Sequence, residues 1–311
     1  MLKEKKTMLI TGGSGLLGLN WALLKHESWN VVFAVNSRFV CLNGIHSIKL
    51  DLSNRDLIRR LIDDFKIDLV VHTAGLTSIE LCEANPRLAR EVNTIFSGNV
   101  AHACKACEIP MIHVSTDNLF DGKDQLVLED HPINPLNIYG KTKADAESLV
   151  QELHSDIIIA RTNFYGWGPP YKHSFSDAIL IALRAGREIT LFSDVYYTPI
   201  VMSELVQTSH DLLDNDLRGV FHVCGNERLT KLSFGKLLAQ KFSLDVSLIK
   251  SGDLASMKNL AMRPFDMSMS NSKTVRELGK NLGSVVDQIE KLQKLEKSNI
   301  KRKLDGIDTL R

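Results

Sequence analysis

Tyr139 and Lys143 are the two residues whose types and spacing point most directly to chemistry. If Tyr139 opens a helix, the spacing of four puts its phenol and the Lys143 ammonium on one face, one turn apart. A free phenol has a pKa of about 10, and a nearby cation lowers it, so the pair could transfer a proton near neutral pH. The same spacing also occurs on solvent-facing amphipathic helices, so the surrounding sequence has to decide between the two interpretations.

A glycine-rich turn near the N-terminus favours the chemical interpretation. The apolar strand Met8 to Ile10 leads into Thr11-Gly-Gly-Ser-Gly-Leu-Leu-Gly18, and an apolar run typical of a helix follows. Glycines at such a turn let the backbone approach a pyrophosphate, which then rests on the helix N-terminus. The order of strand, turn and helix predicts a dinucleotide site that includes Gly12, Ser14 and Gly15. A plain turn is the alternative.

The end of the second expected strand, Asn30 to Val35, bears on the choice of dinucleotide. The next residues are Asn36, Ser37 and Arg38. An NAD site usually has a carboxylate here for the ribose hydroxyls, and this chain has none. Ser37 and Arg38 could instead bind a 2′-phosphate. We therefore predict that NADP(H) is preferred and NAD(H) possible; otherwise Arg38 is a surface residue.

Small or polar residues also follow three later strands, at Asp51-Leu52, Thr73-Ala-Gly75 and Ser115-Thr-Asp117. Strands alternate with helices, one of which, Pro86 to Cys107, carries Asn93. This pattern predicts an α/β fold with a doubly wound, Rossmann-type parallel sheet, on which ligands bind beyond the strand C-termini. Thr116 would then lie close to Tyr139, although Ser115 to Asp117 could also simply form a turn.

The composition changes after the sixth expected strand, Asp156 to Arg161. Phe164 to Tyr171 is rich in aromatic residues, glycine and proline, which marks the start of a substrate-facing part. The predicted division is an NAD(P)-binding domain at residues 1–165, rejoined by about 191–228; a smaller, mainly C-terminal substrate-binding part at 166–190 and 229–283; and a terminal helix with a fraying, charged tail at 284–311.

Overall composition favours a water-soluble protein without a strong charge preference. The chain has 38 Lys and Arg against 37 Asp and Glu, so we expect neither nucleic acid nor an anionic membrane as a partner. No apolar run reaches the length of about 18 residues typical of a membrane span.

Five scattered cysteines indicate reduced thiols in a cytoplasmic protein. Cys104 and Cys107 lack a second pair at zinc spacing, so no metal site is expected.

Seven stretches extend this pattern: the Thr11 to Gly18 turn, Ala74 to Thr77 and on to Glu83, Val92-Asn93, Val114-Ser-Thr-Asp-Asn-Leu-Phe-Asp-Gly122, Asn134-Pro-Leu-Asn-Ile-Tyr-Gly-Lys-Thr-Lys143, Arg161-Thr162 and Arg263-Pro264. Together they resemble the extended short-chain dehydrogenase/reductases, and among them the dTDP-4-dehydrorhamnose reductase group. The resemblance covers roughly residues 7–282. The chain departs from the group at residues 195–200, where aromatic residues replace a usual Gly-x-Pro-Thr segment, and at the loop from Phe164 to Tyr171.

The resemblance implies a catalytic triad of Thr116, Tyr139 and Lys143. Tyr139 would donate a proton to the C4 carbonyl of a nucleotide-linked deoxysugar while NAD(P)H delivers hydride. Thr116 would hydrogen-bond the developing alkoxide, and Lys143 would hold the nicotinamide ribose and lower the Tyr139 pKa. The residues that we assign to the cofactor are Gly12, Ser14, Gly15, Leu16, Leu17, Ser37, Arg38, Asp51, Leu52, Thr73, Ala74, Gly75, Thr77, Asn93, Tyr139 and Lys143. Those assigned to the substrate are Thr77, Thr116, Asp117, Phe164, Tyr197 and Arg263.

Two other functions fit the same residues. One is a nucleotide-sugar epimerase or dehydratase of the same superfamily. The other is a non-catalytic, NADP-binding regulatory subunit such as the beta subunit of methionine adenosyltransferase, to which the chain is also similar. A homodimer is possible in each case.

The aromatic stretches give one further expectation about the substrate. We predict that Phe164 and at least one of Tyr196 and Tyr197 line the pocket beside Tyr139, where flat rings can stack on a base or a sugar. The competing interpretation is that these rings close the joint between the two parts of the molecule.

Overall fold

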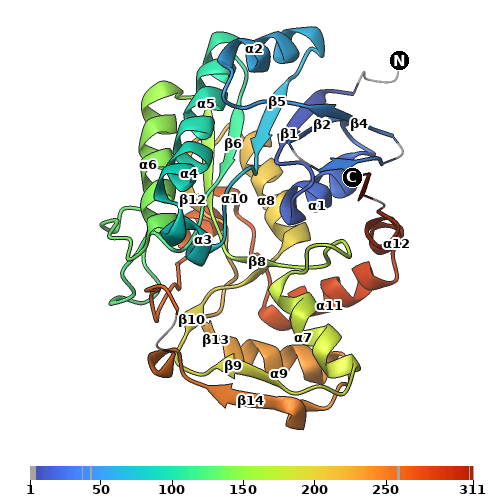
Figure 1. Ribbon diagram of the computed structural model, residues 1–311, viewed down its shortest axis with the longest axis vertical. Helices are drawn as coiled ribbons and strands as arrows, with labels where there is room; N and C mark the ends of the chain where they lie inside the picture. The colour runs from blue at the N-terminus through green and yellow to red at the C-terminus, as the bar shows by residue number, and fades with distance from the viewer. Residues whose placement is uncertain (1–4, 37, 43, 258–259, 308, 311) are drawn as a thin grey trace.

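The computed structural model describes residues 5–36, 38–42, 44–257, 260–307 and 309–310. A seven-stranded, wholly parallel sheet forms the upper part of the molecule in Figure 1, in the order β12-β7-β6-β5-β1-β2-β4. These strands are β1 (Thr7–Thr11), β2 (Asn30–Val35), β4 (Ile45–Lys49), β5 (Leu69–His72), β6 (Met111–Val114), β7 (Ile157–Arg161) and β12 (Gly219–His222). The strand order reverses between β1 and β5, which is the point at which such sheets bind ligands. The predicted fold class is confirmed.

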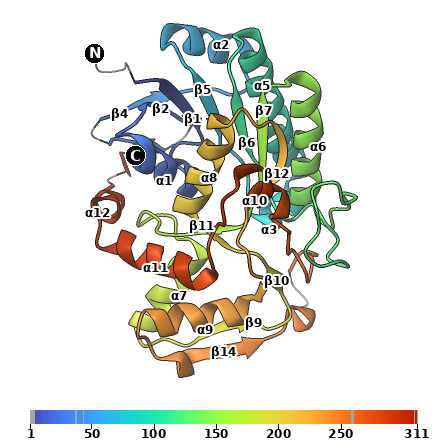
Figure 2. The same cartoon turned by 180° about the vertical axis from the view of Figure 1, so that it is seen from behind.

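Helices cover both faces of the sheet, as the two views in Figures 1 and 2 show. Side chains of a strand alternate between the faces: Leu9 packs into one core, whereas Met8 and Ile10 pack into the other. The Leu9 face is covered by α2 (Arg55–Asp64), α5 (Phe96–Ala106) and α6 (Ile138–Leu153), and the opposite face by α1 (Leu16–Lys25) and α8 (Met202–Asp214).

A smaller lobe lies below the sheet in Figure 1, and we call it the lower lobe. Its helices are α7 (Phe175–Arg184) and α9 (Lys231–Lys241), with two 3-10 turns at Val246–Leu248 and Leu254–Ser256. Its paired strands are β9 (Ile189–Phe192) with β14 (Ile249–Gly252), and β10 (Tyr196–Tyr197) with β13 (Leu229–Thr230); β8 (Phe164–Tyr165) pairs with β11 (Ile200–Val201) at the joint.

The boundaries between the two parts differ from the predicted ones. The strand β9 pairs with β14, so the chain returns to the sheet only at β11 and α8, not at residue 191. The helix α10 (Ser272–Leu278) belongs to the sheet side, because it packs on β12 and Thr274 Oγ1 donates to the His222 carbonyl at 2.9 Å. Such long-range pairings leave no local signal in the sequence.

The C-terminal segment is ordered against the N-terminal half. It forms α11 (Val285–Glu296), α12 (Asn299–Asp305) and β15 (Thr309–Leu310), and β15 pairs with β3 (Phe39–Val40). Leu304 and Ile307 are buried, and Lys303 Nζ lies 3.0 Å from His26 Nε2. The prediction of a fraying tail was wrong, because two apolar residues among the charged ones anchor the segment. Within the described ranges, no helix has both the length and the apolar character needed to cross a membrane.

Candidate active site

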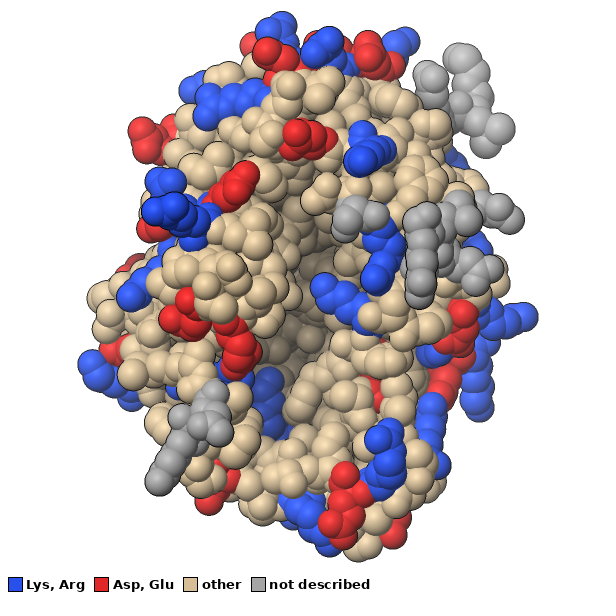
Figure 3. Space-filling model, in the orientation of Figure 1, with Lys and Arg blue, Asp and Glu red and all other residues tan. Residues whose placement is uncertain are grey.

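A cavity of about 660 Å³ opens at the C-terminal ends of the sheet strands. Figure 3 shows it as a hollow down the middle of one face, with Lys and Arg side chains on its right-hand rim. Most of the predicted site residues line it: Gly12, Ser14, Gly15, Leu16, Leu17, Arg38, Asp51, Leu52, Thr73, Ala74, Gly75, Thr77, Thr116, Asp117, Tyr139, Lys143 and Phe164. Ser37, also assigned to the cofactor, lies outside the described residues.

The glycine-rich turn is shaped by close backbone contacts. Gly12 has a φ of +71°, and a Cβ there would lie 2.6 Å from the backbone of Ala74, so the ends of β1 and β5 touch. A Cβ on Gly18 would meet the Gly12 carbonyl oxygen at 2.7 Å. Gly15 caps α1 without a side-chain hydrogen bond, and the first turn of α1 has no acidic residue. The first N–H groups of α1 therefore face the cavity as a site suited to a phosphate.

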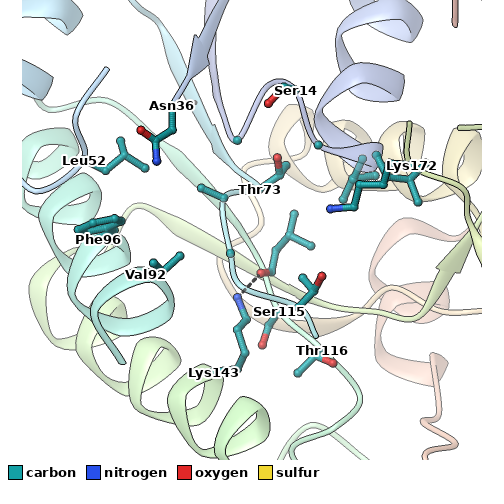
Figure 4. Close-up of a pocket in the computed structure, with 18 of the residues that line it drawn as sticks. Ser14, Asn36, Leu52, Thr73, Val92, Phe96, Ser115, Thr116, Lys143 and Lys172 are labelled. Atoms are coloured by element: carbon teal, nitrogen blue, oxygen red, sulfur yellow. Dashed lines mark hydrogen bonds between the residues drawn. The ribbon is translucent and has the colours of Figure 1, made fainter. Parts of the chain in front are cut away.

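The start of α6 brings Tyr139 to the end of β6. Asn137 caps this helix by accepting from Gly140 N at 2.8 Å. A Cβ on Gly140 would lie 2.3 Å from the Asn118 carbonyl oxygen, so the helix packs directly on the loop that carries Thr116. One turn later, Lys143 Nζ donates to the Val114 carbonyl at 2.7 Å, the dashed line in Figure 4, and lies 3.4 Å from His113 Nε2.

The ionisation of this pair differs from expectation. Burial raises the pKa of Tyr139 to about 12, against a smaller lowering by its hydrogen bond with Thr116. Burial also lowers the pKa of Lys143 to about 8, with Glu147 opposing it. The Lys143 ammonium is held by the Val114 carbonyl rather than by the phenol, so the expected acidification of Tyr139 is absent. The phenol stays protonated at neutral pH, which is the form that a proton donor requires.

Asp117 places a buried carboxylate next to Thr116 and Tyr139. It accepts from Asn118 Nδ2 at 2.8 Å, from Thr116 Oγ1 at 3.3 Å and from Asn163 Nδ2. Burial raises the pKa of Asp117, and these hydrogen bonds and the Lys231 charge oppose the rise. The donors fix the position of the carboxylate and, with it, that of the Thr116 hydroxyl.

The far end of the cavity is formed by the residues after β2 and β4 and by a helix face. Figure 4 shows Asn36, Leu52 and Phe96 on one side, away from Thr116, with Val92 drawn between them and Lys143. The Asp51 carboxylate accepts from Ser53 N at 2.9 Å, which lowers its pKa. No carboxylate follows β2, as the sequence indicates, and Arg38 lines the cavity there.

Val92 and Phe96 are lining residues that the sequence analysis missed. They stand four apart in the predicted helix Pro86 to Cys107, which comprises α4 (Pro86–Arg90), a π-helical turn (Glu91–Ile95) and α5. A π turn shifts the register of the helix face, and such turns are frequent at functional sites. The spacing of four residues, which puts Val92 and Phe96 on one face of the helix, was the signal that could have identified them. Tyr171, which belongs to the aromatic stretch expected near the substrate, also lines the cavity, as do Lys172 and Asn163, which had no such signal.

Asn93 does not reach the cavity and is corrected to a supporting role. It is completely buried. Its Oδ1 accepts from Leu76 N at 2.7 Å, and its Nδ2 donates to the Leu76 carbonyl at 3.1 Å and to Thr142 Oγ1 at 3.0 Å. Asn93 therefore ties the loop after β5 to α6.

The aromatic prediction is right for Phe164 and wrong for the tyrosine pair. Phe164 lines the cavity. Tyr197 is 2 % exposed, packs against Phe234 and lies under Lys231, whose Nζ is 3.3 Å from the ring centroid. Tyr196 stacks with Arg228 at 3.6 Å. The competing interpretation, that these rings close the joint, describes them better.

Arg263 lines a second, adjoining cavity of about 320 Å³ rather than the first. The two cavities share Ile79, Asn118 and Asn163. The second cavity adds Lys231 and an apolar wall from the lower lobe, and Arg263 itself pairs with Glu80. The substrate side is thus a continuation of the main cavity towards the lower lobe.

Across the described ranges, no three His, Cys, Asp or Glu side chains cluster in a way that could hold a metal ion. Cys104 and Cys107 are free thiols, and burial raises the pKa of both, most strongly that of Cys104.

Comparison with known proteins identifies the family that this site belongs to. The sequence model of the family described as "RmlD substrate binding domain" matches residues 6–296. The chain belongs to this family. The predicted resemblance to the dTDP-4-dehydrorhamnose reductase group is thereby confirmed.

Proteins with different functions are similar to this chain. The probable low-salt glycan biosynthesis reductase Agl14 of Haloferax volcanii is 31% identical over 293 residues, covering 91% of this chain and 96% of the relative. The methionine adenosyltransferase 2 subunit beta of Xenopus laevis is 29% identical over 255 residues, covering 78% and 74%. The dTDP-4-dehydrorhamnose reductase of Bacillus anthracis, solved with NADP, superposes with a TM-score of 0.82 at 23% identity, covering 94% of this chain and 100% of that one.

Proposed function

We propose that this protein is an NADPH-dependent reductase of a nucleotide-linked 4-keto sugar. The observation that carries the proposal is the convergence of Thr116, Tyr139 and Lys143 on one cavity with the glycine-rich turn. The family match and the two reductases among the similar proteins support it.

The residues divide the chemistry between them. Bound NADPH would supply the hydride that reduces the carbonyl carbon. Tyr139 Oη donates the proton that the carbonyl oxygen takes up, and its raised pKa keeps that proton available at neutral pH. Thr116 Oγ1 hydrogen-bonds the same oxygen as negative charge develops on it. The buried Lys143 ammonium, which the Val114 carbonyl holds in place, would bind the ribose hydroxyls of the nicotinamide nucleotide.

The cofactor preference follows from charge. Arg38 lines the cavity beyond β2, where no carboxylate stands to bind the 2′-hydroxyl of NADH. A guanidinium makes charge-assisted, bidentate contacts with a phosphate. We therefore assign Arg38 to the 2′-phosphate of NADPH.

A dehydratase is less well supported by the cavity. Eliminating water from a sugar needs a base that removes a carbon-bound proton as well as an acid. Among the described lining residues, the carboxylates are Asp117, which follows β6, and Asp51, which follows β4. Asp117 already accepts three hydrogen bonds. With Tyr139 as the acid, Asp117 would have to be the base, and these hydrogen bonds lower its pKa and so oppose proton uptake.

The similarity to the methionine adenosyltransferase beta subunit keeps a regulatory function as the second candidate. A regulatory subunit would bind the dinucleotide without turning over a sugar. Co-purification with a stoichiometric enzyme partner, together with no turnover of any keto-sugar, would decide for it.

The reductase proposal is tested by NADPH oxidation in the presence of a dTDP-4-keto-6-deoxyhexose. We expect substrate-dependent oxidation by the wild type and a loss of about a hundredfold or more in Tyr139→Phe. NADPH should bind the variant as tightly as the wild type. An unchanged rate in Tyr139→Phe would contradict the mechanism.

A further inference from the structure

A loop of the lower lobe is attached to the glycine-rich turn. We call residues 167–173, between β8 and α7, the Tyr171 loop. Tyr171 Oη donates to the Ser14 carbonyl at 2.9 Å, and Asn20 Nδ2 of α1 donates to the Trp167 carbonyl at 2.9 Å. The loop and the turn are thus held together at two points, although they lie far apart in the sequence.

The loop is also ordered internally. Gly168 N donates to Asp177 Oδ2 at 2.8 Å, and Lys172 N donates to the Pro169 carbonyl at 3.0 Å. A Cβ on Gly168 would lie 3.0 Å from Leu16 Cδ1, so the loop packs against the start of α1. Lys172 therefore stands at a defined place beside the N-terminus of α1.

Two cations meet at this place without an anion to balance them. The Arg38 guanidinium lies 3.9 Å from the centroid of the Tyr171 ring. Arg38 and Lys172 both line the 660 Å³ cavity, and neither has an ion-pair partner within the described part of the chain. Partial burial and then the Arg38 charge lower the pKa of Lys172. This arrangement costs free energy unless an anion binds between the charges.

The position of Lys172 in the cavity indicates that the anion is a phosphate. In Figure 4 Lys172 enters from the side of the cavity opposite Asn36, Leu52 and Phe96, and its amine points into the cavity. The uncapped N-terminus of α1, with no acidic residue in its first turn, adds a positive field at the same place.

We propose that Lys172 is a direct ligand for a phosphate of the bound dinucleotide, so that the lower lobe closes over the cofactor as well as over the substrate. This inference rests on the proposed function only in requiring that the protein binds such a dinucleotide. The loop that the sequence analysis assigned to the substrate thus contributes at least one residue to the cofactor. The phosphate is either the pyrophosphate, which NADH and NADPH share, or the 2′-phosphate, which NADPH alone carries.

The test is the Kd of NADPH and of NADH for the wild type, Lys172→Gln, Lys172→Arg and the control Lys236→Gln. Lys236 is an exposed lysine of α9 that lines neither cavity. Loss of a charge-assisted contact in Lys172→Gln should weaken NADPH by about tenfold or more. Lys172→Arg should retain most of the affinity, and Lys236→Gln all of it.

The two cofactors distinguish the phosphates. Equal weakening of NADH and NADPH in Lys172→Gln assigns Lys172 to the pyrophosphate, and weakening of NADPH alone assigns it to the 2′-phosphate; both support the inference. Unchanged affinity for both cofactors overturns it. A wild-type protein that binds neither cofactor would instead overturn the proposed function. Melting curves without cofactor check that Lys172→Gln is folded.

Discussion

The sheet side of the cavity and its lower-lobe side are built in different ways. On the sheet side, each residue follows a strand whose neighbours in the sheet are fixed by hydrogen bonding, so short motifs at strand ends meet at one edge. On the lower-lobe side, the second cavity is assembled from α3 (Ile79–Ala84), β9, α9 and the Arg263 segment, which only long-range packing brings together. Local sequence therefore specifies the first side far better than the second.

The aromatic residues illustrate the difference. Tyr165, Trp167 and Tyr197 are at most 5 % exposed and belong to the hydrophobic core. Of the aromatic residues at positions 164–171 and 195–200, Phe164 and Tyr171 line the main cavity. A large ring stabilises the fold more when it is buried in the joint between the two parts than when it lines an open cavity. In the joint, its whole surface is removed from water on folding.

The largest expected effect concerns Tyr197 and sharpens this comparison. Tyr197→Ala should lower the free energy of unfolding by about 3–5 kcal/mol, as for other buried aromatic residues. Tyr197→Phe should be nearly neutral, because the Tyr197 hydroxyl is buried without a hydrogen-bond partner in the described structure. Denaturant melts measure both. A Tyr197→Phe protein of normal stability with a raised KM for the sugar would show that Tyr197 belongs to the substrate side after all.

The next effect tests the sheet side through Arg38. Arg38→Ala should weaken NADPH by about 1.5–3 kcal/mol and leave NADH nearly unchanged, because only NADPH carries the 2′-phosphate. Titration with each cofactor measures the difference. The matched control is Arg60→Ala, an exposed arginine of α2 outside the cavity. Equal losses for both cofactors would mean that Arg38 does not bind the 2′-phosphate.

The smallest expected effect is on the free energy of unfolding and concerns Lys143. The proposed reaction uses its buried ammonium, but burying that charge lowers the stability of the fold. The pKa of Lys143 is lowered from 10.5 to about 8 by burial, so between these values the unfolded chain binds more protons and the free energy of unfolding rises with pH. Below pH 8 the full cost of the buried charge is present. Lys143→Met removes that cost and also the hydrogen bond to Val114, so without cofactor we expect a net gain of about 1 kcal/mol at pH 7.

The gain in Lys143→Met should shrink as pH rises towards 10.5, and thermal melts across this range follow it. If Lys143→Met were less stable than the wild type at pH 7, the ammonium would be a net stabilising group in the cofactor-free protein.

The sequence predicted most of the sheet side because its signals are local. Gly12 sits at a backbone contact that excludes any other side chain, and Tyr139 lies one helical turn from Lys143, so both could be located from short patterns. Asn93 was misplaced because its helix contains a π turn, and Lys172 was missed because its loop crosses to the glycine-rich turn from another lobe. Contacts between distant segments depend on packing that no short pattern encodes.

The most direct test of the central claim is the transfer of deuterium from NADPH deuterated at C4 of the nicotinamide to C4 of the keto-sugar. We predict one deuterium in the sugar product for each NADPH oxidised by the wild type. The rate should fall by about a hundredfold or more in Tyr139→Phe, with NADPH affinity retained. Conversion of the sugar without net oxidation of the cofactor, or no transfer to any nucleotide-linked 4-keto sugar, would contradict the account.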